Sequence, residues 1–209
     1  MLEESVADIA TIEEAAKRAF KIGMGPFLLM NVTGIPIAVH AATTLGNELG
    51  PFYAPAAILK AQMEKQENWD IEGDVDESKI ETVMDRFYGV CLGVAAALVD
   101  EGVATIEDTD RGAKIGLRWI LGPFEIMNRI GIDKTFATVD AITQRYPDFN
   151  MPAILARQKE SGQPFEFNLV DLEVKNDVAY ITLNRPEAMN ALNESVVAQL
   201  EQRFTEAEN

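Results

Sequence analysis

Cysteine and histidine are almost absent from this chain of 209 residues, which has one of each, Cys91 and His40. One cysteine excludes an internal disulfide, and the two residues cannot supply the four ligands of a structural zinc site. Both stand in apolar stretches, so we expect a buried thiol and a core imidazole rather than a nucleophile and a base. This cysteine usage fits a reducing compartment, and we expect a cytoplasmic protein.

Basic residues are also scarce, because 18 Lys and Arg stand against 34 Asp and Glu and give a net charge of −16. Such a charge repels phosphate backbones and anionic lipid surfaces. No uninterrupted apolar run reaches the roughly 18 residues of a membrane span, and the acidic start, Met-Leu-Glu-Glu, is unlike a signal peptide. We therefore expect no nucleic acid and no membrane among the partners.

What the chain does have is an internal repeat. Three blocks recur in the same order: Ala10–Glu14 with Ala104–Asp108, Gly25–Ile35 with Gly122–Ile132, and Ala57–Leu59 with Ala153–Leu155. The second pair is identical at seven of eleven positions. The separation is 94 residues in the first block and 97 in the second, which predicts a short insertion at residues 118–121. Three ordered blocks indicate a duplication.

Each copy has the pattern of several helices. Thr11 with Glu14 has the spacing of a capping box before a helix that Gly23 ends, and Thr105 with Asp108 repeats that start. Gly-Pro-Phe then opens a short helix, with proline in the first turn. Longer helices are expected over residues 36–48 and 133–146, and final ones after Pro55 and Pro152.

The second copy begins with a longer helix that the first lacks. Ser78 with Glu81 predicts a capping box, and residues 79–101 predict a helix. Its wide apolar face is formed by Val83, Phe87, Val90, Val94, Ala97 and Leu98. The first copy opens with residues 2–7, which resemble the end of that helix, 99–104, so we expect the first copy to be truncated at its start.

An acidic segment, residues 67–77, lies between the copies and is interpreted as a solvated linker. Oxygen-bearing side chains fall at the spacing of a calcium loop from Asp70 to Glu81. Val75 stands where that loop needs glycine, so we favour the linker over a calcium-responsive protein.

After Pro164 the pattern becomes extended. Residues 170–174 alternate apolar and polar, residues 175–177 predict a turn, and residues 178–183 are rich in strand formers. A helix is expected from about Glu194. Because a lone hairpin is marginal in water, this segment has the character of the opening of a further domain.

Two sets of motifs carry a resemblance to known families. Residues 101–108 (EGVATIED) and 122–132 (GPFEIMNRIGI) resemble the C-terminal helical domain of the 3-hydroxyacyl-CoA dehydrogenases, a unit that often occurs twice. Residues 178–193 (VAYITLNRPEAMNALN) are similar to the start of the crotonase, or enoyl-CoA hydratase, family. The order resembles the central part of a fused β-oxidation enzyme.

The resemblance implies a mainly α-helical chain in three parts. Residues 1–77 would be a truncated first repeat and residues 78–165 a second one, both with the fold of the 6-phosphogluconate dehydrogenase C-terminal domain. Residues 166–209 would be the start of a crotonase-like domain, folded as a short hairpin and a helix.

In the family a Rossmann domain binds NAD and supplies the catalytic His and Glu. This chain has no Gly-x-Gly-x-x-Gly motif, so we expect no catalytic, NAD-binding or metal-binding residue here, and no activity of the chain alone. His40 does not match the catalytic histidine. Asp85 stands where the family has a substrate-binding Asn, and a carboxylate has no N–H to donate, so the second copy is expected to be structural.

The resemblance also implies part of a substrate pocket. The residues expected on its acyl side are Met24, Gly25, Pro26, Phe27 and Met30. A core position is the structural alternative for them. Asn31 and Asn128 are expected to bond locally at helix ends. Residues 185–190 would begin a cradle for CoA adenine, with a plain polar turn as the alternative.

Two functions follow. The first is the substrate-binding and dimerisation part of a 3-hydroxyacyl-CoA dehydrogenase fused to an enoyl-CoA hydratase, with an acyl-CoA substrate, a Rossmann-domain partner and a homodimer. The second is a free-standing helical module that binds acyl-CoA or dimerises without catalysis. Upstream sequence would distinguish them, because only the first requires a dinucleotide-binding motif there.

Overall fold

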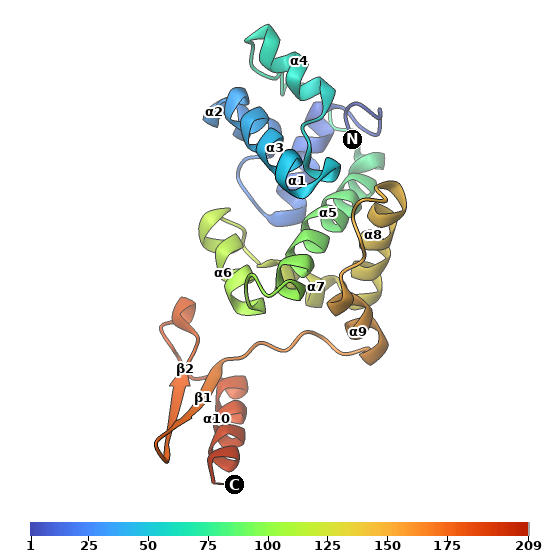
Figure 1. Ribbon diagram of the computed structural model, residues 1–209. Helices are drawn as coiled ribbons and strands as arrows, with labels where there is room; N and C mark the ends of the chain where they lie inside the picture. Colours follow the sequence, from blue (N-terminus) through green and yellow to red (C-terminus); the bar gives the residue numbers. More distant parts are fainter. Residues whose placement is uncertain (209) are drawn as a thin grey trace. The chain divides into compact units, whose positions relative to one another are not determined.

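A central helix of 21 residues, α5 (Ile80–Asp100), organises the larger of two compact units in a computed structural model that describes residues 1–208. This unit is Met1–Phe165 and its regular elements are all helical, whereas the unit from Glu166 onward holds one hairpin and one helix. The prediction of a mainly α-helical chain with a C-terminal hairpin and helix is therefore confirmed (Figure 1).

Four helices precede α5 and four follow it within the larger unit. They are α1 (Ile9–Phe20), α2 (Pro26–Thr33), α3 (Ile35–Leu49), α4 (Ala57–Lys65), α6 (Ile106–Gly116), α7 (Pro123–Ile130), α8 (Ile132–Arg145) and α9 (Ala153–Ser161). A short 3₁₀ turn, Pro51–Tyr53 (η1), follows α3, and a second one, Glu77–Lys79 (η2), precedes α5.

The central helix packs on both halves of the unit. Toward the first half, the Tyr88 hydroxyl donates to the Ala19 carbonyl at 3.2 Å, and the ring of Phe20 meets the rings of Phe87 and Tyr88 edge to face. Toward the second half, Gly89 lets α8 approach so closely that a Cβ there would overlap the Thr138 carbonyl. α5 is thus shared by α1 and α8.

By length and composition, the stretch Glu77–Asp100 would also suffice to cross a membrane, and so would α2 and α3 taken together despite a 107° bend between them. The first of these is the helix that packs between α1 and α8, and the central helix of a soluble protein passes the same test. The charged residues Asp85 and Arg86 interrupt the apolar sequence of α5, so its uninterrupted apolar stretch is short.

Corresponding helices of the two halves begin 97 residues apart for α1 and α6, α2 and α7, and α3 and α8, and 96 residues apart for α4 and α9. Asp8 caps α1 and Thr105 caps α6, each through its side-chain oxygen, and both Lys21 and Arg118 have left-handed backbone. The insertion predicted at residues 118–121 is therefore wrong. The insertion was inferred from the Ala-Thr-Ile-Glu identity. That identity pairs residues that are three positions out of structural register.

Two of the predicted capping boxes are also wrong. Thr11 lies inside α1, fully buried, and its hydroxyl accepts the Asp76 N–H at 2.9 Å, because Asp8 already caps the helix. Ser78 caps nothing, since its N–H and hydroxyl both donate to the Asp76 carboxylate. Thr105 is the N-cap that was predicted.

A side-chain amide clasps the end of each half. Asn31 donates to the Trp69 carbonyl at 2.9 Å and accepts the Trp69 N–H at 2.8 Å. Asn128 makes the same pair with Phe165, at 2.8 and 2.7 Å. The partners are 38 and 37 residues away, so the prediction of local bonds at helix ends is wrong.

The acidic segment 67–77 is fixed to the helices rather than free in solvent. Trp69 is 6% exposed and its ring meets Phe27 edge to face at 5.0 Å. The carbonyls of Glu67 and Asn68 accept from the Gln62 amide. The linker interpretation holds only for the exposed carboxylates, because one aromatic side chain anchors the segment in the core.

The second unit is a hairpin with a helix against it. β1 (Val170–Lys175) pairs antiparallel with β2 (Val178–Leu183), in register from Val170 with Leu183 to Lys175 with Val178. Asn176 and Asp177 both have positive φ, the backbone that a two-residue hairpin turn requires. α10 (Glu194–Ala207) follows a short 3₁₀ turn, Pro186–Ala188 (η3).

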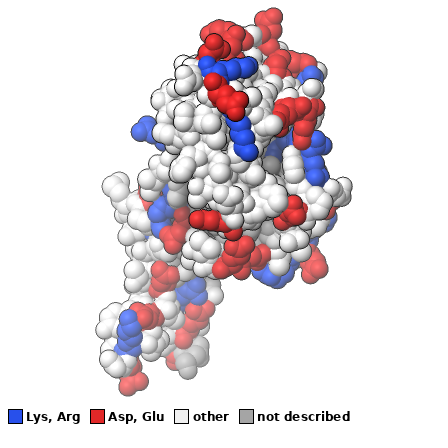
Figure 2. All heavy atoms as spheres, turned by 45° about the horizontal axis from the view of Figure 1, so that its top comes forward, with Lys and Arg blue, Asp and Glu red and all other residues white. Residues whose placement is uncertain are grey.

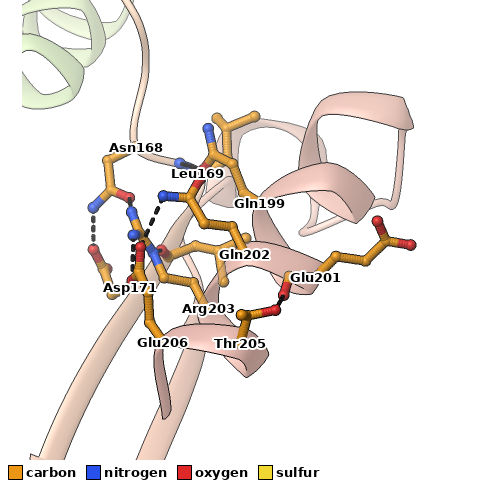
Figure 3. Close-up of polar contacts among 10 residues, drawn as sticks. Asn168, Leu169, Asp171, Gln199, Glu201, Gln202, Arg203, Thr205 and Glu206 are labelled. Atoms are coloured by element: carbon orange, nitrogen blue, oxygen red, sulfur yellow. Dashed lines mark hydrogen bonds and ion pairs between the residues drawn. The ribbon is translucent and has the colours of Figure 1, made fainter. Parts of the chain in front are cut away.

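Side chains of α10 satisfy the backbone at the start of β1 (Figure 3). Gln199 accepts the Leu169 N–H and donates to the Phe167 carbonyl, both at 2.7 Å. Arg203 donates to the Val170 carbonyl at 2.9 Å. Val170 and Val196 are buried between the two elements. Val178 and Tyr180 are exposed on the opposite face of the hairpin, because they pair with Lys175 and Glu173, whereas Val174 is an exposed residue on the face of Val170. One side of the hairpin therefore lacks a cover within this unit.

Candidate functional site

A buried carboxylate holds the N-terminus of the second helix in each half. Glu13 of α1 accepts the N–H groups of Phe27 and Leu28, and Asp110 of α6 accepts those of Phe124 and Glu125 at 2.7 and 3.0 Å. Both carboxylates are almost fully buried. They occupy the place where a helix N-terminus would otherwise receive an anion.

The glycine before each of these helices is required by the carboxylate. A Cβ on Gly25 would lie 2.6 Å from Glu13 Oε2 and 2.8 Å from the Glu13 carbonyl oxygen, and one on Gly122 would overlap Asp110. Gly25 was predicted to lie on the acyl side of a substrate pocket. In the structure, the group that approaches its backbone is the protein's own carboxylate.

Burial raises the pKa of Asp110 to about 6, although the two backbone N–H groups that it accepts act in the opposite direction. Water exclusion disfavours the charged form more than two hydrogen bonds stabilise it. This side chain is therefore sensitive to pH between its ordinary range and neutrality.

The five residues predicted for the acyl side of the pocket fall into three environments. Pro26, Phe27 and Met30 line a cavity of about 250 Å³ together with Ile12 and Trp69. Phe27 is also buried in the core. Met24 is 41% exposed, and Gly25 contacts Glu13 rather than the cavity. The structure thus brings three of the five together, and their role as substrate contacts stays a prediction.

Asp85, which stands in place of the family's Asn, faces a second cavity of about 590 Å³ between α5 and α8. The Asp85 carboxylate forms an ion pair with Lys134 at 2.9 Å, and its contact with Asp85 raises the pKa of Lys134. Arg86 beside it is paired with Glu4. An ion pair occupies this position, so no free amide donor is presented here.

A cavity of about 1,050 Å³ was not anticipated from the sequence. It lies among α3, η1, α5, α6 and the residues that follow α8. Its walls are mainly apolar and include Val90, Val94 and Leu98 of the apolar face predicted for α5. The signal in the sequence was the apolar face predicted for α5, because this face is wider than a single packing helix can cover.

Cys91 agrees in part with the buried thiol that was predicted, whereas His40 differs from its predicted environment. Cys91 is half-buried on the wall of the cavity of about 1,050 Å³, and burial raises the pKa of its thiol to about 12. His40 is exposed on α3, because the buried side of that helix is formed by Ile35 and Val39. In the part of the chain that the structure describes, no three His, Cys, Asp or Glu side chains gather as a metal site would require.

The segment proposed for CoA adenine closes on itself. The Arg185 N–H donates to the Asn190 side chain at 2.9 Å, and the Arg185 guanidinium donates to the Ala191 carbonyl at 3.1 Å. Met189 is 93% exposed beside it. The plain polar turn accounts for every contact found here.

Charge is uneven over the surface. Figure 2 shows one face of the larger unit, where carboxylates gather toward the top and a broad area carries no charged side chain. Several large apolar side chains of α2 and α3 are exposed, namely Leu29, Val32, Ile37, Leu45 and Leu49.

The fold and these contacts define a helical domain built around one shared helix, and sequence comparison assigns it to a family. The profile of the 3-hydroxyacyl-CoA dehydrogenase C-terminal domain matches residues 1–74 and 82–164. The chain belongs to the family of 3-hydroxyacyl-CoA dehydrogenase C-terminal domains.

Among curated proteins, the chain is similar to the 3-hydroxybutyryl-CoA dehydrogenases of two Mycobacterium tuberculosis strains, CDC 1551 / Oshkosh and ATCC 25618 / H37Rv. The identity to each is 31% over 71 residues, which is 33% of this chain. The aligned part spans a quarter of the length of these relatives, 25%.

Proposed function

We propose that this chain is the substrate-side helical part of an NAD-dependent 3-hydroxyacyl-CoA dehydrogenase. The observation that carries the proposal is the match of the family profile along most of the larger unit. The regular elements of residues 1–165 are all helical, so they offer no βαβ crevice for a dinucleotide. NAD and the catalytic His and Glu would therefore come from a separate Rossmann domain, and this chain alone would be inactive.

Within this function the two halves have different tasks. The first half would supply the acyl side of the substrate pocket through Met24, Gly25, Pro26, Phe27 and Met30. The second half would be structural, since Asp85 is held by Lys134 at 2.9 Å and leaves no amide for a substrate carbonyl. The repeated carboxylate and amide contacts support a duplication of one domain, residues 1–77 and 78–165.

The second unit would be the beginning of an enoyl-CoA hydratase domain, so that the parent protein carries two β-oxidation activities. Its uncovered hairpin face supports this, because Val178 and Tyr180 would be buried by further elements of a larger domain. The exposed apolar side chains of both units favour a homodimer. An acidic chain with one cysteine favours a cytoplasmic location without membrane or nucleic acid partners.

The test is NAD reduction with 3-hydroxybutyryl-CoA, first by this chain alone and then after mixing with a separately expressed Rossmann domain of the same protein. We expect no rate alone and a measurable rate on mixing. A rate from the chain alone, or none in either case, contradicts the proposal. If CoA esters still bind without any rate on mixing, the free-standing acyl-CoA module becomes the better description.

A matched pair of variants locates the pocket. Met24→Glu places a carboxylate at a half-exposed residue of the predicted acyl side, and Met189→Glu does the same at an exposed residue of the second unit. In the mixed assay we expect Met24→Glu to raise KM for the acyl-CoA at least several-fold and Met189→Glu to leave it unchanged. Equal effects would remove Met24 from the pocket.

A further inference from the structure

The cavity of about 1,050 Å³ is bounded by three helices that leave apolar surface uncovered. We propose that it is a slot for an amphipathic α-helix, the counterpart of α5 for the first half of the unit. The inference rests on the structural repeat and not on the dehydrogenase activity. The outcome of the mixing assay therefore leaves it untouched.

The first wall of the slot is α3, whose counterpart α8 packs on α5. Ile142 of α8 lies against Gly89 of α5 and is 2% exposed. Leu45, 97 positions earlier in α3, lines the cavity and is 43% exposed. Thr138 is likewise buried against α5, whereas its counterpart Ala41 is exposed. The same helix face is thus covered in one half and bare in the other.

The second wall is α6, whose counterpart α1 packs on the other side of α5. Phe20 at the end of α1 is 4% exposed, and its counterpart Leu117 is 60% exposed on the cavity wall. Ala15 is fully buried, whereas a Cβ on its counterpart Gly112 would meet no atom within 4 Å. A helix that covered α3 as α5 covers α8 would also cover this face of α6.

The third wall is α5 itself. Val90, Val94 and Leu98 line the cavity, on the part of the predicted apolar face that neither α1 nor α8 covers. Phe52 and Phe149, which are counterparts in the two halves, stack at 4.6 Å between ring centroids. The repeat therefore predicts two equivalent helix positions beside this aromatic pair. α5 occupies one of them, and the cavity marks the other.

The end of the slot is marked by a second pair of counterparts. Asp100, the last residue of α5, accepts the Ile154 N–H at 2.9 Å and so holds the start of α9. Glu3 accepts the Ile58 N–H at 2.8 Å and holds the start of α4 in the same way. Glu3 also lines the cavity, so the occupant would be a helix of about 20 residues with its C-terminal end at Glu3, as α5 has its end at Asp100.

The chemistry of the cavity favours a helix over a small anionic ligand. The volume is at the upper limit of small-molecule pockets, which reach about 1,000 Å³. The charged residues on its walls are Glu3, Glu4, Asp108 and Asp148 against Arg145, and Arg145 is itself paired with Glu4 at 2.7 Å. A CoA ester would meet carboxylates without a free cation. An apolar helix face with small residues, like that of α5 at Gly89 and Gly93, meets no such cost.

The test supplies the helix and measures access to Cys91 on the cavity wall. In the full chain, residues 1–3 are replaced by a second copy of residues 80–100, joined to Glu4 so that the copied Asp100 stands at position 3. The copied cysteine is changed to alanine, which leaves Cys91 as the only thiol. We expect modification of Cys91 by a neutral thiol reagent to slow at least tenfold and Tm to rise.

Two variants of the grafted chain serve as a matched pair. Leu117→Arg places a charge in the slot, and Ile115→Arg places one on the same helix at a residue that is 74% exposed and does not line the cavity. Only Leu117→Arg should return the modification of Cys91 to the rate found in the original chain. Unchanged modification in the grafted chain overturns the proposal. So does protection of Cys91 in the original chain by palmitoyl-CoA or by raising the protein concentration, which would assign the cavity to a ligand or to a second copy.

Discussion

At the scale of single residues, the contact between Gly25 and Glu13 governs the start of α2. A Cβ on Gly25 would lie 2.8 Å from a backbone oxygen as well as 2.6 Å from the carboxylate, so rotation of the Glu13 side chain cannot relieve it. We expect Gly25→Ala to lower the free energy of unfolding by about 1–3 kcal/mol. Gly23→Ala is the control, because its Cβ would meet nothing within 4 Å, and urea unfolding should show it unchanged. Equal stability of the two variants would contradict the contact.

Asp110 makes stability depend on pH at the same scale. Its pKa is raised in the folded state to about 6, so the folded protein binds the proton more tightly than the unfolded chain does. The stabilisation is complete below the ordinary pKa near 4 and is lost as the pH rises through about 6, by up to about 3 kcal/mol. Asp110→Asn should remove this part of the pH dependence of urea unfolding between pH 4 and 7. The exposed Asp108→Asn should keep it, and a profile equally steep in both variants would refute the assignment.

At the scale of elements, each amide clasp fixes one connection to the helices before it. Asn31→Ala leaves the buried backbone groups of Trp69 without partners, and we expect it to cost about 1–3 kcal/mol. Hydrogen exchange should then become faster at the Trp69 amide and stay slow at the Phe165 amide, which Asn128 still holds. Asn128→Ala should show the reverse. Faster exchange at both amides in either variant would mean that the two clasps are not independent.

At the scale of the whole molecule, the uncovered apolar surfaces and the net charge of −16 act in opposite directions. Charge repulsion keeps copies apart at low salt, and screening shortens its range to about 10 Å at 0.1 M. We expect light scattering to show an apparent mass that rises with salt and with protein concentration. Replacement of Val178 and Tyr180 by threonine tests the contribution of the uncovered hairpin face and should weaken this association. A monomer under all conditions would contradict the proposed homodimer.

The sequence determined the elements of this protein, because helix caps, proline and glycine positions and apolar periodicity act over a few residues. The Gly-Pro-Phe starts, the long apolar helix and the hairpin before Glu194 all lie where those local signals placed them. The family was also readable, since its motifs are contiguous.

Only the tertiary structure decided which residues meet across the chain. The sequence offered Thr11 as a cap and Asn31 as a local contact, yet each bonds a residue that packing brings within reach from far along the chain. Ser78 was also predicted as a cap, but its donors are taken by Asp76, two residues before it. It likewise predicted one apolar face for α5, where the fold uses two sides of the helix and leaves Val90, Val94 and Leu98 uncovered. Hydrogen bonds and burial depend on distance in space. Asp8 and Thr105, which are 97 residues apart, therefore share the role of helix cap, although sequence identity had paired residues 94 apart in that block.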